Sequence, residues 1–171
     1  MTTALGRVAD RILVTAAAVA TAATLGAGLA DAQPGAGPRE QSQSAAGTEG
    51  LDPALAAAYT LAEQQAHAEG VPLSITSGYR TPEQQEQLWQ DGLATYGDPA
   101  EARRWVLPPA ESTHVSGHAI DVGPQVGAHW LETNGNRWGL CRTFDNEWWH
   151  FELVTVPGTP CPPTVPDASM R

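Results

Sequence analysis

The chain has 171 residues, which is enough for one folded domain and little more. It carries 19 acidic and nine basic residues, so that its formal net charge is -10 at pH 7, and this acidity argues against nucleic acid as a partner. All nine basic residues are arginine. Any permanent positive charge in a binding site must therefore come from arginine or from a metal ion.

The first 32 residues have the organisation of a secretory signal peptide. Arg7 and Arg11 form a short basic region, residues 12–29 are uncharged and mostly apolar, and Ala-Asp-Ala at 30–32 matches a small-x-small cleavage site. A membrane anchor is the alternative, but the run is rich in weakly hydrophobic Ala and Gly and the cleavage motif follows it directly. We therefore expect cleavage, a secreted or cell-envelope location and no lasting membrane anchor.

The mature chain is expected to have three parts. Residues 33–50 are rich in Gly, Ala, Gln and Ser without apolar periodicity, which predicts a flexible linker. The folded domain is expected over residues 51–157, and residues 158–171 form a proline-rich tail. The two cysteines, Cys141 and Cys161, indicate one disulfide in an exported chain, which attaches the tail to the domain. Free thiols or thiolate zinc ligands are the alternatives, and export and the wide spacing disfavour them.

Three helices and one strand are predicted in the first half of the domain. Asp-Pro at 52–53 begins a helix that ends at Gly70, and residues 73–77 alternate as in a strand. A second helix begins at the capping box of Thr81 and Gln84 and runs towards Gly92 or Tyr96, and a shorter one follows Asp-Pro at 98–99. The apolar faces of the first two helices are expected to comprise Leu55, Ala58, Tyr59, Ala62 and Ala66, and then Leu88, Trp89 and Leu93.

The second half of the domain is predicted to contain two strands and one helix. Residues 118–122 and 149–154 are the strands, and residues 127–133 are the helix between them. Helices come early and strands are interleaved, which predicts an α+β fold and not a regular array of βαβ units.

His114 and Asp121 are candidate ligands of one metal ion. In an extended strand they would lie about 23 Å apart, so the chain must fold back between them, and Gly117 tolerates the backbone angles of such a turn. Beyond the turn, Asp121 lies on the strand face opposite Ile120. A helical reading would pair His114 with His118 instead, but the Ser-Gly turn and the β-branched residues argue against it, so His118 is interpreted as supporting or exposed.

The second candidate cluster surrounds His150. In the strand that follows, His150 and Glu152 lie on one face, opposite the apolar side chains. Glu147 has the wrong parity for that strand and must come from the preceding turn, so it approaches the metal from another angle and suits the role of a base. Glu152 is the competing base, unless it pairs with Arg142 or faces solvent. The helical histidines His67 and His129 are expected at the surface.

Two histidines and an aspartate form a ligand set that zinc accepts, and a further carboxylate can activate water. Three motifs carry these residues in order: Ser-Gly-Tyr-Arg at 77–80, Ser-x-His-x-x-Gly-x-Ala-x-Asp at 112–121, and Glu-x-Trp-His at 147–150. Together they resemble the VanY-type zinc D-alanyl-D-alanine carboxypeptidases over about residues 51–157. The family often has proline where this chain has Trp148.

The resemblance implies that His114, Asp121 and His150 bind Zn²⁺ and that Glu147 is the catalytic base. It also implies the hedgehog/DD-peptidase fold, an α+β fold in which a small antiparallel sheet carries the zinc site and helices flank the sheet.

The resemblance implies three further roles in substrate binding. Arg80 would bind the scissile carbonyl oxygen or the substrate carboxylate. Gln85 and Ser112 would bind the end of the peptide.

The leading hypothesis is an exported zinc metallopeptidase that hydrolyses the terminal D-Ala-D-Ala bond of peptidoglycan stem peptides with metal-activated water. The alternatives are an L,D-carboxypeptidase or a peptidoglycan endopeptidase with the same site, and a non-catalytic zinc-stabilised module that binds the cell wall. The presence of Glu147 and Arg80 favours an enzyme, because a binding module needs neither. The expected partner is a stem peptide, and the chain is expected to be a monomer.

Overall fold

The computed structural model describes residues 44–171. The predicted signal peptide over residues 1–32 and the predicted linker up to residue 43 lie outside the described residues. Within residues 44–171, no helix has both the length and the apolar character that crossing a membrane requires. In chain order the elements are α1 (Pro53–Ala68), β1 (Ser74–Ser77), α2 (Pro82–Tyr96), α3 (Pro99–Ala102), β2 (Ala119–Gly123), α4 (Gln125–Asn134), β3 (Leu140–Arg142) and β4 (His150–Leu153), with 3-10 helices at Gly135–Trp138 and Ala168–Met170.

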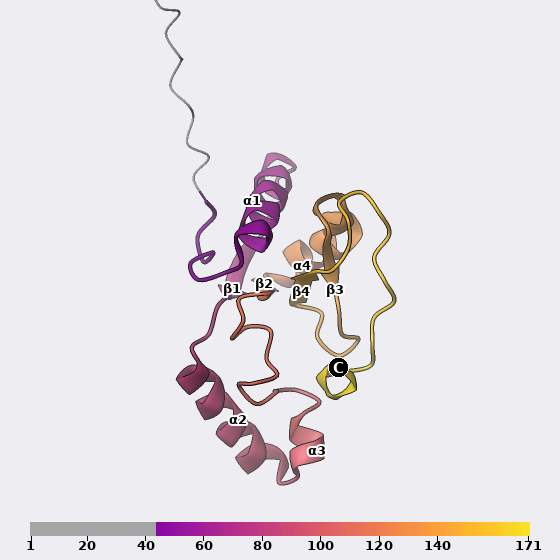
Figure 1. Cartoon of the computed structure of the whole chain (residues 1–171). Coiled ribbons are helices and arrows are strands. Elements are labelled where there is room, and N and C mark those ends of the chain that lie inside the picture. The colour runs from indigo at the N-terminus through magenta and orange to yellow at the C-terminus, as the bar shows by residue number, and fades with distance from the viewer. Residues whose placement is uncertain (1–43) are drawn as a thin grey trace, which may run out of the picture. The chain divides into compact units, whose positions relative to one another are not determined.

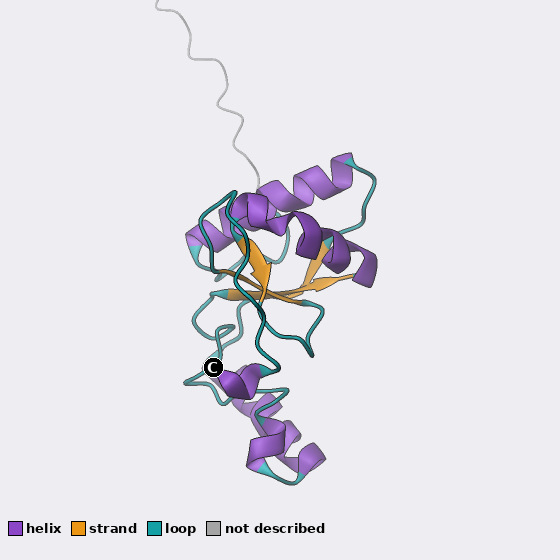
Figure 2. Cartoon of the chain, turned by 90° about the vertical axis from the view of Figure 1, so that its right-hand side faces the viewer, coloured by secondary structure: helices purple, strands orange, loops and turns teal. Residues whose placement is uncertain are grey.

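The four strands form one antiparallel sheet in the order β1-β2-β4-β3. Figures 1 and 2 show α1 and α4 on one side of this sheet and α2 and α3 on the other. The predicted α+β fold with a small antiparallel sheet is confirmed. Strand β3 was not predicted, because three residues are too few for an alternating pattern to be visible.

Helix α1 and the sheet make the main core. The Asp52 carboxylate accepts hydrogen bonds from the backbone N–H groups of Ala54 and Leu55, at 2.9 and 3.2 Å, and so caps the helix. The predicted apolar face of α1 is buried throughout. It packs against the apolar side chains that β2 and β4 send to this side, Ile120, Val122 and Phe151.

Helix α2 differs from its prediction. The capping box of Thr81 and Gln84 is present, but the expected apolar face is not fully buried: Trp89 and Leu93 are half-buried and Leu88 is 40% exposed. The buried residues of α2 are Gln85 and Gly92, because the helix packs against α3 and the loop that follows it instead of the sheet. A Cβ atom at Gly92 would lie 2.5 Å from the Cγ1 atom of Val106, which shows how closely the loop approaches.

Two segments at the edges of the predicted domain also pack on it. Residues 45–50, expected to be linker, lie against α1, and the backbone N–H of Ala45 donates to Thr60 Oγ1 at 3.1 Å.

At the other end, Cys141 and Cys161 form the expected disulfide, which closes a loop of 20 residues and stabilises the fold by roughly 3 kcal/mol on the chain-entropy model. Beyond it, Val165 forms an isolated β-bridge with Phe144.

The alternation of β2 and β4 positions the candidate site. While their apolar side chains face α1 and α4, Asp121, His150 and Glu152 lie on the opposite face, and Asp121 is the direct cross-strand partner of His150. The site is therefore placed on the rigid sheet, on the side of α2, α3 and the tail.

Candidate active site

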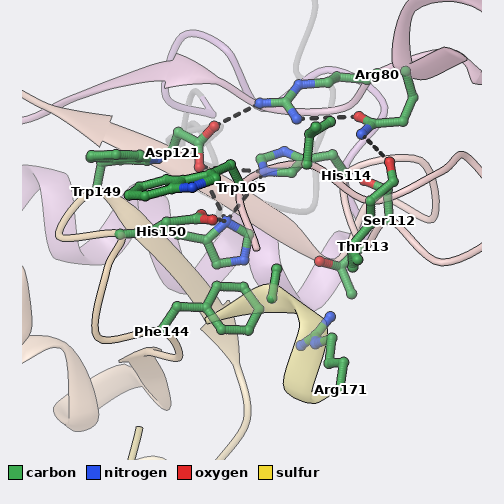
Figure 3. Close-up of a pocket in the computed structure, with 15 residues that line it drawn as sticks. Arg80, Trp105, Ser112, Thr113, His114, Asp121, Phe144, Trp149, His150 and Arg171 are labelled. Carbon is green, nitrogen blue, oxygen red and sulfur yellow. Dashed lines mark hydrogen bonds and ion pairs between the residues drawn. The ribbon is translucent and has the colours of Figure 1, made fainter. Parts of the chain in front are cut away.

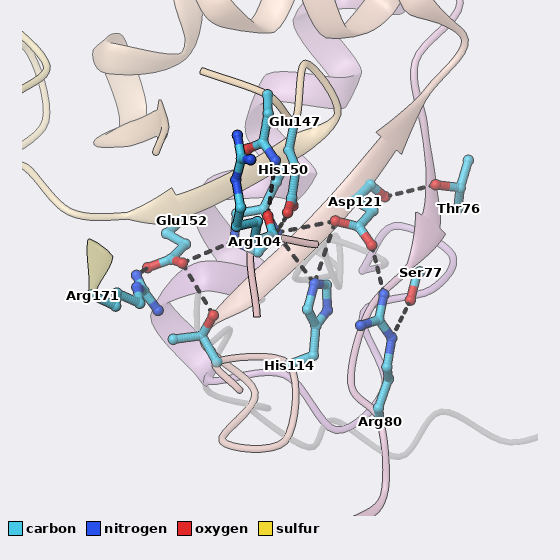
Figure 4. A network of polar contacts seen from close by, with 12 residues as sticks. Thr76, Ser77, Arg80, Arg104, His114, Asp121, Glu147, His150, Glu152 and Arg171 are labelled. Carbon is cyan, nitrogen blue, oxygen red and sulfur yellow. Dashed lines mark hydrogen bonds and ion pairs between the residues drawn. The ribbon is translucent and has the colours of Figure 1, made fainter. Parts of the chain in front are cut away.

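Three predicted ligands meet on this face of the sheet. The Nε2 atom of His114 lies 3.3 Å from the Oδ1 atom of Asp121, and the Nδ1 atom of His150 lies 3.2 Å from the same oxygen. The two nitrogens are 3.3 Å apart. All three residues are buried, and Figure 4 shows their side chains converging. The structure thus brings together the histidines and the aspartate that the sequence singled out.

His114 reaches this position because the loop before β2 turns at Gly117. That residue has φ of 74°, a left-handed conformation that favours glycine, and a Cβ atom there would lie 2.7 Å from the carbonyl oxygen of Gly50. The Gly117 carbonyl accepts a hydrogen bond from the backbone N–H of Asp52 at 2.8 Å. The predicted reversal at Gly117 is therefore confirmed, and it is fixed by the start of α1.

The outer nitrogen of each histidine has a hydrogen-bond acceptor. His114 Nδ1 lies 2.8 Å from the Gly78 carbonyl oxygen, and His150 Nε2 lies 2.9 Å from Glu152 Oε1. A neutral histidine that donates from its outer nitrogen has a lone pair on its inner nitrogen. When both histidines are neutral in this way, the inner nitrogens and the Asp121 oxygen are three acceptors that a cation satisfies. Without a cation, a proton on an inner nitrogen bonds to Asp121 instead.

The donor set and its spacing fit zinc. Ligands on a tetrahedron with bonds of about 2.0–2.1 Å lie about 3.3 Å apart, close to the 3.2 and 3.3 Å separations found here. Outer hydrogen bonds to a carbonyl and to a carboxylate are also typical of metal-ligating histidines. His114, Asp121 and His150 are thus a suitable zinc site.

The ionisation of this cluster follows from its hydrogen bonds. Burial opposes ionisation of Asp121, but hydrogen bonds from His114 and His150 hold the pKa of its carboxyl well below the usual range. Burial likewise opposes a charge on His150, yet its hydrogen bonds to Asp121 and Glu152 raise its pKa to about 9. A metal ion must therefore compete with a proton for this histidine.

Glu147 lies in the turn before β4, as its parity predicted. Its Oε2 atom is 3.6 Å from His150 Nδ1, and the residue is 6% exposed. Burial raises the pKa of Glu147 to about 7, although the charge of His150 opposes this shift. A carboxyl group with a pKa near neutrality can both accept and return a proton, which is the property that general acid–base catalysis needs.

Arg80 lies on the other side of Asp121. Its Nη2 atom donates to Asp121 Oδ2 at 2.7 Å, its Nη1 atom to Gln85 Oε1 at 3.2 Å, and its Nε atom to Ser77 Oγ at 3.0 Å. Gln85 is 1% exposed, and its Nε2 atom donates to the Leu107 carbonyl oxygen at 2.7 Å. These bonds fix the Arg80 guanidinium beside the three predicted metal ligands.

These side chains border one pocket, shown in Figure 3. The predicted residues Arg80, Gln85, Ser112 and Glu147 all line it together with the three ligands. Of the remaining lining residues, Thr113 and Trp149 lie within the motifs at 112–121 and 147–150, but the sequence assigned them no role in a pocket. The others come from the loops between α3 and β2 and between β3 and β4 and from the tail, and no local motif marks them. The remaining lining residues are together Trp105, Val106, Leu107, Thr113, Phe144, Trp149, Ala168 and Arg171.

Glu152 neither pairs with Arg142 nor faces solvent, the two alternatives to a role as base that the sequence suggested. It does not face solvent, since it is 4% exposed, and Arg142 pairs instead with Glu132 at 2.9 Å. Glu152 bonds to His150 and accepts a hydrogen bond from Thr113 Oγ1 at 3.1 Å. It therefore lies behind the metal cluster.

The other histidines agree with their predictions. His67, His118 and His129 are exposed at the surface.

Fold and site together define the class: an α+β protein whose sheet presents a buried His–Asp–His group that could hold a metal ion, beside a carboxylate of raised pKa, an arrangement suited to hydrolysis. A protein-family model described as VanY, D-alanyl-D-alanine carboxypeptidase, matches residues 48–156. The chain belongs to this family. The resemblance seen in the motifs is thereby confirmed.

A curated relative agrees with this assignment. The chain is 32% identical over 117 residues to a D-alanyl-D-alanine carboxypeptidase of Enterococcus faecalis (strain ATCC 700802 / V583). The match covers 53% of this chain and 43% of the relative, so the chain spans less than half the length of that protein.

Solved structures are similar to this chain as well. The vancomycin resistance D,D-pentapeptidase VanY from the VanB-type resistance cassette, as a point mutant in complex with Zn(II), matches with 28% identity and a TM-score of 0.56, over 61% of this chain and 73% of that one. VanYB in complex with D-alanine-D-alanine matches with the same identity and TM-score, over 61% and 72% of the two chains. The L,D-carboxypeptidase DacB of Streptococcus pneumoniae matches with 25% identity and a TM-score of 0.51, over 66% and 70%.

Proposed function

We propose that this protein is an exported zinc metallopeptidase that hydrolyses the terminal D-Ala-D-Ala bond of peptidoglycan stem peptides. The observation that carries the proposal is one pocket in which His114, Asp121 and His150 converge with zinc-like spacing beside Glu147. Family membership supports the substrate, because one relative is named a D-alanyl-D-alanine carboxypeptidase and another was solved with D-alanine-D-alanine.

When bound, a zinc ion would lower the pKa of a coordinated water and polarise the substrate carbonyl. Glu147 is positioned to do the proton transfer. Its carboxylate lies beside the ligand cluster but bonds to neither of the outer histidine nitrogens, so it is free to take a proton from the attacking water. The protonated Glu147 can then return that proton to the leaving amine.

Arg80 supplies the positive charge that an acidic protein needs to bind an anionic peptide end. It borders the pocket next to Asp121, where its guanidinium can stabilise the negative charge that develops on the carbonyl oxygen or bind the terminal carboxylate. Ser112 lines the same pocket and offers a hydroxyl to the peptide end. Gln85 contributes by holding Arg80, since its amide is already bonded to Arg80 and to Leu107.

The second candidate is an L,D-carboxypeptidase with the same catalytic groups. The similarity to DacB, an L,D-carboxypeptidase, favours keeping it as an alternative. The two reactions would share the three metal-ligand residues, Glu147 and Arg80, and both release a terminal D-alanine. They differ in the configuration of the residue that supplies the scissile carbonyl, which is D in one reaction and L in the other. Substrate specificity therefore decides between them.

The test is mass spectrometry of zinc-loaded protein incubated separately with a stem pentapeptide ending in D-Ala-D-Ala, a tetrapeptide and a cross-linked muropeptide. We expect the pentapeptide alone to lose one alanine. Cleavage only of the tetrapeptide would support the L,D reading, and cleavage only of the muropeptide an endopeptidase. No product in any reaction, with zinc bound, would replace the proposal with a non-catalytic binding module.

We propose export from the signal-peptide pattern of residues 1–32. The disulfide between Cys141 and Cys161 supports it, since such bonds persist in oxidising compartments. Expression of the whole chain in a bacterial host, followed by N-terminal sequencing, should recover a protein that begins at Gln33 outside the cytoplasm. Retention of the first 32 residues in the cytoplasm would contradict export.

A further inference from the structure

The tail takes part in the catalytic pocket although it lies beyond the part of the chain that resembles the family. The family match ends at residue 156. Residues 157–171 follow it, and two of them, Ala168 and Arg171, line the pocket. The family match therefore does not include Ala168 and Arg171, and their contacts indicate what they do.

Several interactions fix the tail in this place. The disulfide at Cys161 attaches it to β3, and the β-bridge of Val165 directs it along the loop that follows β3. Asp167 then caps the 3-10 helix Ala168–Met170 and accepts a hydrogen bond from Arg104 Nε at 2.9 Å. This helix presents Arg171 to the back of the metal cluster, as Figure 4 shows.

Arg171 is connected to the predicted metal ligand His150 through Glu152. Its Nη2 atom donates to Glu152 Oε2, while the other carboxylate oxygen, Oε1, accepts hydrogen bonds from His150 Nε2 at 2.9 Å and Thr113 Oγ1 at 3.1 Å. The guanidinium carbon of Arg171 also lies 5.4 Å from the ring centre of Phe144, and that ring is 5.0 Å from the His150 ring. The tail thus reaches His150 by two routes, one polar and one aromatic.

We propose that Arg171 is a positioning residue that fixes the Glu152 carboxylate and, through it, the orientation of the His150 ring as a metal ligand. The inference rests on the proposed function in so far as His150 binds zinc. Glu152 is 4% exposed, and a buried carboxylate that loses its ionic partner must find another one or shift. A shift of this carboxylate would turn the ring, because His150 has Glu152 as the partner of its outer nitrogen. Loss of such an outer partner typically weakens metal binding 10- to 100-fold.

The test compares variants of the full chain by zinc affinity, measured in competition with a chromogenic chelator. We expect Arg171→Ala to weaken zinc binding up to about 10-fold, the low end of the range for loss of an outer partner, because Glu152 itself remains. Arg171→Lys should weaken it less, because lysine keeps the charge. Met170→Ala is the matched control: Met170 precedes Arg171, is 62% exposed and does not line the catalytic pocket. It should bind zinc as the unaltered chain does. Thermal unfolding of the metal-free variants reports whether each is folded.

A second readout separates positioning from a general loss of structure. Cobalt(II) in place of zinc reports ligand geometry by its visible absorption, and we expect Arg171→Ala to change this spectrum while Met170→Ala leaves it unchanged. If Arg171 acts through Glu152, the double variant Arg171→Ala/Glu152→Gln should bind zinc about as weakly as Glu152→Gln alone.

Three results would overturn the inference. They are an unaltered zinc affinity of Arg171→Ala, an unaltered cobalt spectrum of that variant, or a loss of zinc affinity in the double variant equal to the product of the losses in the two single variants. None of these measurements depends on turnover. If the unaltered chain binds zinc and Arg171→Ala binds it equally well, only this inference fails. If the unaltered chain binds no zinc, the proposed function fails with it.

Discussion

On the face of the sheet covered by α1 and α4, Ile120 and Phe151 are fully buried among apolar side chains. On the opposite face their sequence neighbours Asp121 and His150 are 7% and 4% exposed, nearly as buried, yet they lie among charged and polar groups. Burial on the first face stabilises the fold. Burial on the second costs free energy unless every charge has a partner. The same two strands therefore carry a stabilising face and a functional face, and substitutions should separate the two.

The largest effect is expected at a ligand on the functional face. His114→Ala removes one of the three converging donors, and zinc binding should be lost, with turnover, while the apolar face keeps the chain folded. Metal analysis of the purified variant and its thermal unfolding with and without zinc check this result, because only a chain that binds zinc is stabilised by it. Unchanged metal stoichiometry would contradict the assigned site.

The next effect concerns Glu147, which lies beside the ligands without being one of them. Glu147→Gln keeps the size of the side chain but removes the base, so kcat/KM should fall about 10²- to 10⁴-fold while zinc remains bound. Glu111→Gln is the control, since Glu111 forms a surface ion pair with Arg103. Full turnover by Glu147→Gln would exclude Glu147 as the base.

The apolar face should respond in the opposite way. Phe151→Ala leaves a cavity between the sheet and α1, where the ring is 0% exposed, and should lower the free energy of unfolding by about 3–5 kcal/mol. Denaturant unfolding of the metal-free chain measures this loss, and kcat/KM at a temperature where the variant is folded should change little. Leu61→Ala, at a side chain that is 50% exposed, is the control. A loss below about 1 kcal/mol would show that the ring is not part of the core.

The smallest expected effect is a pH dependence of the free energy of unfolding, and it arises from Tyr59 in α1. Burial, and then the negative charge of Glu63, raise the pKa of Tyr59 above its ordinary value of 10.0, while its hydroxyl donates to Glu63 Oε1 at 3.1 Å. The raised pKa in the folded chain means that Tyr59 stabilises the fold below pH 10 and that this contribution is lost as the pH rises, because the unfolded chain releases the proton first. The free energy of unfolding should fall by about 1 kcal/mol over the first pH unit above 10.

Denaturant titrations at several alkaline pH values measure this loss. The Tyr59→Phe variant has no hydroxyl to ionise, so its stability should decline less steeply over the same range. Equal slopes for the two proteins would exclude Tyr59 as the source.

Much of the fold was predictable because its signals are local. Proline and capping residues mark the starts of α1 and α2, and alternation marks the faces of β2 and β4. The same kind of signal predicted that the apolar face of α2 is buried, but Leu88 is exposed and Trp89 and Leu93 are only half-buried. Periodicity reports which side of a helix is apolar, but it does not report whether a second layer covers that side.

The residues of the candidate site also fall into two groups, those indicated by sequence motifs and those brought in only by tertiary packing. The motif spacing, the turn at Gly117 and the family resemblance were sufficient to single out His114, Asp121, Glu147 and His150. The convergence of the two motifs depends on the pairing of β2 with β4. The bond from Arg171 to Glu152, the aromatic walls of the pocket and the neighbours of Gln85 were decided by tertiary structure alone. They join segments distant in sequence, and only packing of the whole chain brings those segments into contact.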